Sequence, residues 1–165
     1  MKEVMQVCPQ AVSVVTTKAK DRLYGITVSS FTSVSLEPPL ILVSIAKASR
    51  NHNVFTNAKE LAVNLLADDQ RSVSDRFAGR TQADERFDGL KIHYDKTSSP
   101  IIGGSCAYIE CRNWKAYNGG DHSLVLGEVV HARRVTDKSP LIYYTRQYTT
   151  IISPESAPSP VEILW

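Results

Sequence analysis

The chain of 165 residues has no apolar run near the roughly 20 residues that a membrane-spanning helix needs. Its first residues have no apolar core before a cleavage site, so we expect no secretory signal. The net charge of +2 is too small to favour a nucleic-acid surface. With 42% hydrophobic and 22% charged residues, the composition is typical of a soluble globular protein. We therefore expect a cytoplasmic protein that binds neither membranes nor nucleic acids.

Cysteine and histidine are scarce and show no spacing that predicts a metal site. The cysteines Cys8, Cys106 and Cys111 are odd in number, and we interpret all three as reduced, buried small hydrophobes. The four histidines are scattered, with no HxH or HxxxH pair. We therefore expect no metal and no metal catalysis.

The length suits one domain with a substantial core and is too short for two ordinary domains. We place this domain at residues 1–152. Residues 153–165 form a C-terminal tail in which Ser and Pro are frequent, and we expect an extended strap or a disordered end there.

A hydroxyl-rich stretch runs from Gly25 to Pro39, where six of the fifteen residues are Ser or Thr. β-Branched and aromatic residues between the hydroxyls favour a strand. An ordinary half-buried strand alternates hydrophobic residues with charged ones, whereas this stretch alternates them with small hydroxyls. Such a surface suits a planar ring with a polar edge. The alternative is a Thr/Ser-rich edge strand with no ligand.

The hydrophobic pattern elsewhere predicts a mainly β fold with short helical insertions. We expect a first hairpin from strands around residues 11–17 and 23–28, and a strand at 40–45 buried on both faces because it is nearly all aliphatic. Further strands are expected at 60–66, 106–117, 122–135 and 141–144. Short helices are expected near 54–58 and after 68–70. Together these elements indicate a β-barrel.

Two details of the expected C-terminal strands can be tested in the structure. In the strand at 106–117, the alternation places Glu110 and Arg112 toward water. In the strand at 122–135, Gly127 is a candidate bulge, because an isolated glycine within a strand often marks one. The segment from Asn118 to Asp121 is a tight turn by composition.

A polar, basic loop after the aliphatic strand is a candidate anion site. Ser49 or Asn51 could begin a short helix there, and free amides beside Arg50 suit a phosphate. The alternative is a capped helix whose Arg50 is simply solvated.

Several segments occur together in an order that resembles the flavin reductase-like family, the small reductase components of two-component flavin-dependent monooxygenases. The segments are 25–39, 48–52, 69–79, the Gly-Asp-His motif at 120–122 with Ser123 and Leu124, and 140–144 with Tyr148. The resemblance covers roughly residues 8 to 150. One departure is that many relatives have a Gly-Arg pair before the final aromatic, where this chain has Arg146 and Gln147 before Tyr148.

The resemblance implies an FMN-binding split β-barrel, usually a homodimer with the cofactor near the subunit interface. It implies an NAD(P)H:flavin oxidoreductase that transfers a hydride from NADH or NADPH to FMN or FAD and supplies reduced flavin to a partner monooxygenase. Three alternatives remain open at this point. They are a flavoredoxin-like electron carrier, a ferric reductase, and a barrel module that binds another ligand or none.

The family motif assigns a role to each candidate site residue. Residues expected to line the isoalloxazine ring are Thr27, Val28, Ser29 and Ser30. Residues expected at its pyrimidine edge or ribityl chain are Ser33, Val34 and Ser35. Residues expected to hold the phosphate are Ser49, Arg50 and Asn53. Weaker candidates for closing the pocket are Phe77, Arg86 and Tyr148, for which core packing or surface charge is the alternative.

His122, in the Gly-Asp-His motif, is the expected catalytic residue. The resemblance places it by the nicotinamide, where it could bond the carboxamide without acting as an acid or base. The alternative is a histidine that only orders the preceding turn.

Overall fold

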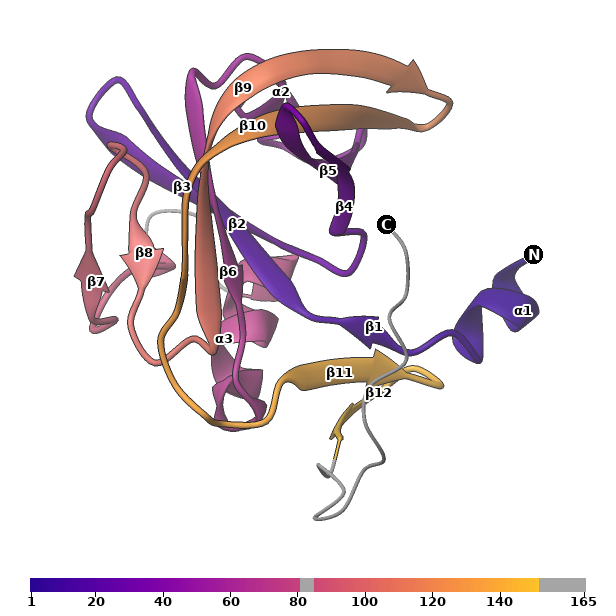
Figure 1. Ribbon diagram of the computed structural model, residues 1–165. Helices are drawn as coiled ribbons and strands as arrows, with labels where there is room; N and C mark the ends of the chain where they lie inside the picture. The colour runs from indigo at the N-terminus through magenta and orange to yellow at the C-terminus, as the bar shows by residue number, and fades with distance from the viewer. Residues whose placement is uncertain (81–84, 152–165) are drawn as a thin grey trace.

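Antiparallel pairing joins seven strands into one curved sheet in the computed structural model, which describes residues 1–80 and 85–151 (Figure 1). The strands, in chain order, are β2 (Ser13–Ala19), β3 (Arg22–Val28), β4 (Thr32–Leu36), β5 (Pro39–Ala46), β6 (Glu60–Leu65), β9 (Ala107–Gly119) and β10 (His122–Arg134). Their order across the sheet is β3-β2-β6-β9-β10-β5-β4. Because β3 and β4 are both edges, the barrel is split rather than closed, as the family resemblance implies.

The remaining described elements are short. The other strands are β1 (Gln10–Ala11), β7 (Ile92–His93), β8 (Ile101–Ile102), β11 (Leu141–Tyr144) and β12 (Gln147–Thr150). The helical segments are α1 (Lys2–Gln6), α2 (His52–Thr56), η1 (Asp68–Gln70), α3 (Arg71–Asp75) and η2 (Arg76–Arg80). The prediction of a mainly β fold with short helical insertions is confirmed. The expected tail at 153–165 lies outside the described residues.

The predicted hairpins form where the turn residues indicated them. Strands β2 and β3 pair from Ser13 opposite Val28 to Ala19 opposite Arg22. Strands β9 and β10 meet at His122 opposite Gly119, and their register shifts at Gly127. A Cβ atom on Gly127 would lie 2.7 Å from the Cβ atom of Cys111, so only glycine fits there without a shift of its neighbour. The predicted bulge is therefore confirmed.

Strand β5 differs from the prediction of burial on both faces. Its residues alternate between buried Ile41, Val43 and Ile45 and partly exposed residues between them. The strand lies one place from the sheet edge, between β10 and β4. It therefore packs on the core with one face only, although both faces are largely aliphatic.

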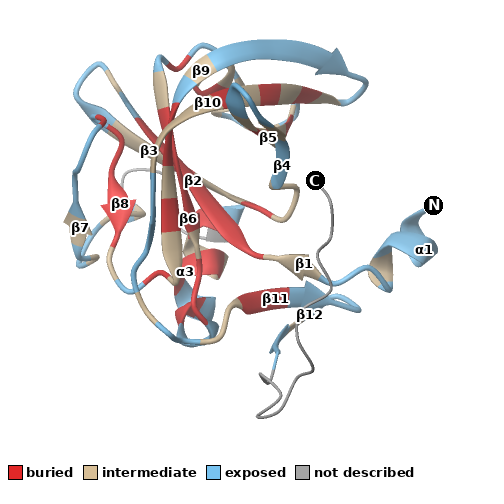
Figure 2. Ribbon diagram, in the orientation of Figure 1, coloured by how far each residue is buried: buried red, intermediate tan, exposed pale blue. Residues whose placement is uncertain are grey.

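The two larger hydrophobic clusters lie beside the sheet (Figure 2). One lies within the barrel and includes Val43, Phe55 and Val125. The other joins β2 to the helical segments and includes Val14 and Phe77. Figure 2 shows burial concentrated in β2, β6 and the first half of β9, whereas α1 and the far half of β9 are exposed. The second cluster positions α3 against the sheet.

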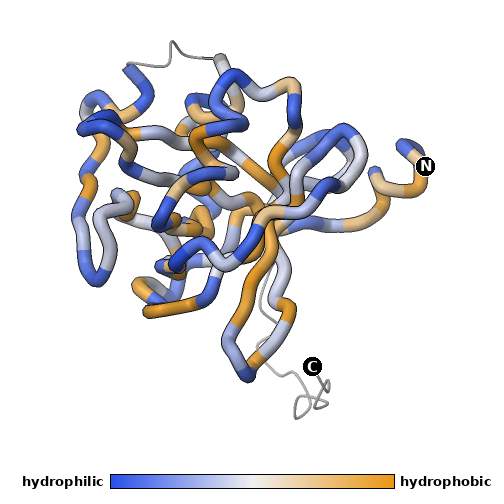
Figure 3. Tube along the Cα trace, turned by 90° about the horizontal axis from the view of Figure 1, so that it is seen from above, coloured by the Kyte–Doolittle hydropathy of each residue, from blue (hydrophilic) through white to orange (hydrophobic). Residues whose placement is uncertain are grey.

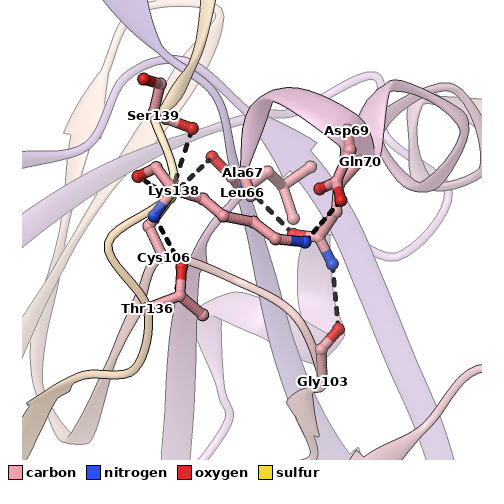
Figure 4. Close-up of polar contacts among 9 residues, drawn as sticks. All are labelled: Leu66, Ala67, Asp69, Gln70, Gly103, Cys106, Thr136, Lys138 and Ser139. Atoms are coloured by element: carbon pink, nitrogen blue, oxygen red, sulfur yellow. Dashed lines mark hydrogen bonds and ion pairs between the residues drawn. The ribbon is translucent and has the colours of Figure 1, made fainter. Parts of the chain in front are cut away.

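Side-chain hydrogen bonds fix the start of α3 (Figure 4). Gln70 accepts from the Ala67 backbone N–H at 3.1 Å and donates to the Gly103 carbonyl at 2.9 Å. Lys138 also pairs with Asp69, and this contact raises the pKa of the lysine. The beginning of the helix is therefore tied to two distant loops.

Glu110 is the clearest correction to the sequence analysis. We expected it to face water, but it is fully buried and its carboxylate accepts hydrogen bonds from the 96–97 segment. The donors are the backbone N–H groups of Lys96 and Thr97 and the Thr97 hydroxyl, the last two at 2.8 Å. The 95–100 segment crosses this face of β9 and supplies those donors, which strand alternation alone cannot reveal. Arg112 is exposed, as predicted.

We predict that Glu110→Ala lowers the free energy of unfolding by about 2–4 kcal/mol, because it leaves buried donors without an acceptor. Urea denaturation measures the change. Arg112→Ala, on the exposed part of the same strand, is the matched control and should cost less than about 0.5 kcal/mol. Equal effects of the two substitutions would contradict a structural role for the buried carboxylate.

The cysteines lie in three different environments. Cys111 is buried, and burial raises the pKa of its thiol to about 12. Cys106 is partly buried, and burial also raises its pKa. Cys8 is exposed, so the prediction that all three are buried is wrong for it, because it follows α1 outside the sheet. Within residues 1–80 and 85–151, no helix is long and apolar enough to cross a membrane.

Candidate functional site

A cavity of about 920 Å³ opens between the end of β3, the loop after β5, α3 with η2, and the β11–β12 hairpin. The described residues that line it are Val12, Ile26, Thr27, Val28, Ser29, Ser49, Arg50, Asn51, Arg71, Ser74, Asp75, Phe77, Ala78, Gly79, Arg86, Tyr143, Arg146, Gln147 and Tyr148. A volume of this size is within the range of cofactor sites, which are about 300–1,000 Å³. The cavity includes the first part of the hydroxyl-rich stretch.

Close contact between Gly25 and Phe77 positions one wall of the cavity. A Cβ atom on Gly25 would lie only 2.3 Å from the Phe77 ring, so the ring occupies the space that any other residue would need. Phe77 is almost fully buried and meets Phe87 edge-to-face with ring centroids 4.9 Å apart. Thr27 adds a second connection, since its hydroxyl donates to the Ser74 carbonyl at 2.7 Å. These contacts hold α3 and η2 against β3.

Tyr148 connects the last hairpin to α3. Its hydroxyl lies 2.9 Å from the Ser74 hydroxyl and donates to Asp75 at 3.2 Å. The Arg71 guanidinium lies over its ring, 5.2 Å from the centroid. A guanidinium stacked on an aromatic face keeps its N–H donors directed sideways toward a ligand.

The cavity is strongly cationic although the chain as a whole is nearly neutral. Its lining includes four arginines, Arg50, Arg71, Arg86 and Arg146, from four different segments of the chain. Asp75 is the one acidic side chain among the described lining residues. Guanidinium groups bind phosphate oxygens through paired, charge-assisted hydrogen bonds. The lining therefore suits a ligand that carries more than one anionic group.

The loop after β5 leads into the short helix α2, as predicted. The Ser49 N–H donates to the Ala46 carbonyl and the His52 N–H to the Ser49 carbonyl, each at 3.0 Å. Asn51 occupies the position before α2 but makes no side-chain capping bond within the described residues. This loop directs Ser49 and Arg50 into the cavity.

The structure brings together about half of the predicted site residues. Thr27, Val28, Ser29, Ser49, Arg50, Phe77 and Tyr148 line the cavity, as does Arg86. Ser30, Ser33, Val34, Ser35, Asn53 and His122 are not among the described lining residues. The Ser30 hydroxyl is occupied by the Ser44 backbone, accepting its N–H at 2.9 Å. Residues 33–35 lie on β4, an edge of the sheet.

His122 lies at the start of β10, opposite Ala46 on β5. Its side chain is 42% exposed, and Nδ1 lies 2.7 Å from a carboxylate oxygen of Asp121. This hydrogen bond and the charge of the ring lower the pKa of Asp121. The Asp121 carbonyl accepts the Lys47 N–H, so the turn that carries His122 contacts the Ser49–Arg50 loop region.

Sequence reasoning missed several cavity residues, chiefly Arg71, Asp75, Tyr143 and Gln147. Arg71 and Asp75 lie at the two ends of α3, and Tyr143 and Gln147 lie in the β11–β12 hairpin. The predicted residue Tyr148 could have indicated the hairpin residues. A two-residue turn pairs Gln147 with Tyr144 and Tyr148 with Tyr143, so Tyr143 lies beside Tyr148.

Comparison with known proteins identifies the family. The model of the flavin reductase like domain matches residues 5–151, so this chain belongs to that family. An NADH-dependent FMN reductase, SmoA, of Agrobacterium fabrum is 40% identical over 132 residues, which are 80% of this chain and 74% of that protein. The reductase subunit HsaB of a flavin-dependent monooxygenase from Rhodococcus jostii is 34% identical, over 90% of this chain and 75% of that subunit.

Solved structures agree with this assignment. The NADH:FAD oxidoreductase SgcE6 of Streptomyces globisporus, in complex with NAD and FAD fragments, has a TM-score of 0.86 and 30% identity. The match covers 94% of this chain and 93% of that one. The flavin reductase HpaC, complexed with NADP+, has a TM-score of 0.83 and 32% identity over 91% and 95% of the two chains.

We predict that Gly25→Ala destabilises the protein by about 1–3 kcal/mol, because the added methyl group displaces the Phe77 ring. Thermal or urea denaturation measures the change. The double variant with Phe77→Leu should lose less than the sum of the two single losses, since a smaller side chain leaves room for the methyl group. Strict additivity would show that the two residues do not compete for one space.

Proposed function

We propose that this protein is an NAD(P)H:flavin oxidoreductase that reduces FMN or FAD and supplies reduced flavin to a partner monooxygenase. The observation that carries the proposal is the arginine-lined cavity at the hydroxyl-rich end of β3, in a chain of the flavin reductase like family. Relatives named as an NADH-dependent FMN reductase and as a monooxygenase reductase subunit support both parts of it. The protein would act in the cytoplasm.

The residues present fit a flavin. Thr27, Val28 and Ser29 lie at the end of β3, an edge strand, so their backbone groups offer a strand edge to a flat ring. Ser49 and Arg50 would hold the phosphate, with Asn53 one turn further along. Phe77 and Tyr148 would close the cavity against water.

A bound flavin supplies the hydride acceptor, so the protein needs to provide only binding, orientation and electrostatics. Arginines near the ligand favour the negative charge that reduction leaves, because preorganised donors and cations stabilise charge where it develops. Holding the two rings at near contact removes an entropic barrier worth several kcal/mol. His122 would orient the nicotinamide through its carboxamide.

We also propose that the protein forms a homodimer in which Ser30, Ser33, Val34, Ser35 and His122 approach the flavin. Three exposed apolar features support this proposal. On the edge strand β4, Val34 is 50% and Leu36 73% exposed, and an unpaired apolar edge strand normally needs a cover. On the far half of β9, Trp114 and Tyr117 are exposed. No residue of α1, which is described in full, is buried.

Figure 3 shows the N-terminal segment projecting from the body of the molecule with hydrophobic residues along it. Val4, Met5 and Val7 account for this exposed surface. A second chain packed over α1 or β4 would remove these side chains from water.

We predict that the protein oxidises NADH and that this oxidation depends on added FMN or FAD. The loss of NADH absorbance measures the rate. His122→Ala should lower the turnover about tenfold or more, which corresponds to about 1.4 kcal/mol of transition-state stabilisation. Asn118→Ala, which alters the same turn at a side chain that bonds Lys47 rather than the imidazole, is the matched control and should retain most of the activity.

Strong turnover in both variants would leave the enzyme intact and reduce His122 to a residue that orders its turn. A wild-type protein that binds flavin but oxidises neither NADH nor NADPH would exclude the reductase and favour the electron carrier.

We predict that Leu36→Glu, a charge in the exposed apolar edge of β4, shifts the protein from dimer to monomer in light scattering coupled to size-exclusion chromatography. The charge would have to be buried without a partner, which costs several kcal/mol. Lys20→Glu, in the exposed β2–β3 turn, is the control and should leave the mass unchanged. A wild-type protein that is monomeric at all concentrations would contradict the proposed dimer.

A further inference from the structure

The β11–β12 hairpin closes with a turn whose residues are poorly suited to it. Thr145 and Arg146 both have positive φ, at 46° and 63°. Two-residue hairpin turns of this kind strongly prefer Asn and Gly, because other side chains clash with the backbone in the left-handed region. Thr145 is β-branched, which makes this conformation more unfavourable still.

The β2–β3 hairpin offers a comparison within the same chain. Its turn residues, Lys20 and Asp21, have φ of 48° and 60°. Aspartate tolerates the left-handed conformation because its short side chain bonds locally. Arginine has no such compensation at the equivalent second position. The backbone therefore does not explain why residue 146 is an arginine.

The cavity does explain it. Arg146 lines the cavity, whereas Thr145 is not among the described lining residues. The Thr145 N–H donates to the Gln6 carbonyl at 2.9 Å, which fixes the tip of the hairpin. Strained residues that persist beside a ligand cavity are a recognised sign of function.

Arg71 completes a pair of cations at this end of the cavity. It is held over the Tyr148 ring, and it comes from α3 rather than from the hairpin. Arg50 comes from a separate segment, the loop that precedes α2. In Figure 1, α2 lies at the top behind β9 and β10, whereas α3, β11 and β12 lie at the bottom.

We propose that Arg146, together with Arg71, binds the pyrophosphate of a dinucleotide and so determines which nucleotides the cavity accepts. This inference rests on the proposed function, in which Ser49 and Arg50 hold the phosphate next to the flavin ring. FMN carries only that one phosphate. The two guanidinium groups on α3 and on the last hairpin match the two linked phosphates of FAD or of NAD(P)H.

The test compares Arg146→Gly with Thr145→Gly in the full chain. Both should raise the melting temperature by about 2–4 °C, because glycine relieves the left-handed strain. Only Arg146→Gly should weaken dinucleotide binding, by about tenfold or more, since it removes a charge-assisted contact. Arg146→Asn, which suits the turn but lacks the charge, should reproduce the loss if the glycine variant folds poorly.

The dissociation constants of FMN and FAD are measured by flavin fluorescence, and the KM of NADH is measured with FMN as acceptor. FMN binding should be unchanged in the Arg146 variants but weakened in Arg50→Ala. Weaker binding of FAD alone identifies FAD as the dinucleotide that Arg146 contacts. A rise in the KM of NADH alone identifies NADH instead. Both changes together identify a subsite that the two dinucleotides share.

Equal loss of FMN and FAD binding, or no change in any constant, would overturn the inference, as would the same loss in Thr145→Gly. If the wild type oxidises neither NADH nor NADPH, the proposed function fails. The FAD and FMN constants then decide the inference alone, with an unchanged FAD to FMN ratio overturning it.

Discussion

The contact between Gly25 and the Phe77 ring is the constraint on which the site depends. Gly25 lies in an edge strand, and its missing side chain lets an aromatic ring approach the backbone closely. That approach places α3 and η2 against β3, and α3 in turn carries Arg71, Ser74 and Asp75. Tyr148 of the last hairpin then bonds Ser74 and Asp75 through its hydroxyl. The walls formed by β3, by α3 with η2 and by the last hairpin are thus positioned one by another.

Local pattern was enough to predict a mainly β barrel with short helices, because the sequence signals for strands and turns here are strong. Hairpin turns at residues 20–21 and 120–121, the bulge at Gly127 and the short helices all follow from residue types that act on their own neighbours. Long-range contacts were not predictable in the same way. Glu110 is buried by a loop that begins fifteen residues earlier, and nothing in the alternation of β9 indicates it.

Most of the predicted residues that line the cavity lie in short continuous segments, and Phe77, Arg86 and Tyr148 are the exceptions. Thr27, Val28 and Ser29 are neighbours, as are Ser49 and Arg50, and all five reach the cavity. Arg71, Arg146 and Tyr143 meet there only because α3 and the last hairpin pack together. The positive charge of Arg71 and Arg146 was hidden in a net charge of +2, since an overall sum does not report where cations gather.

The pairing of β1 with β11 also bears on how the protein is made. The cavity combines residues from Val12 to Tyr148, and Gln10 and Ala11 pair with Tyr143 and Ile142. During translation, the early strands can form while the ribosome is still adding the later ones, but the cavity cannot close until the last hairpin has emerged. A nascent chain therefore has no complete cavity for most of its synthesis. A ligand of this cavity stabilises the finished fold but does not guide its early steps.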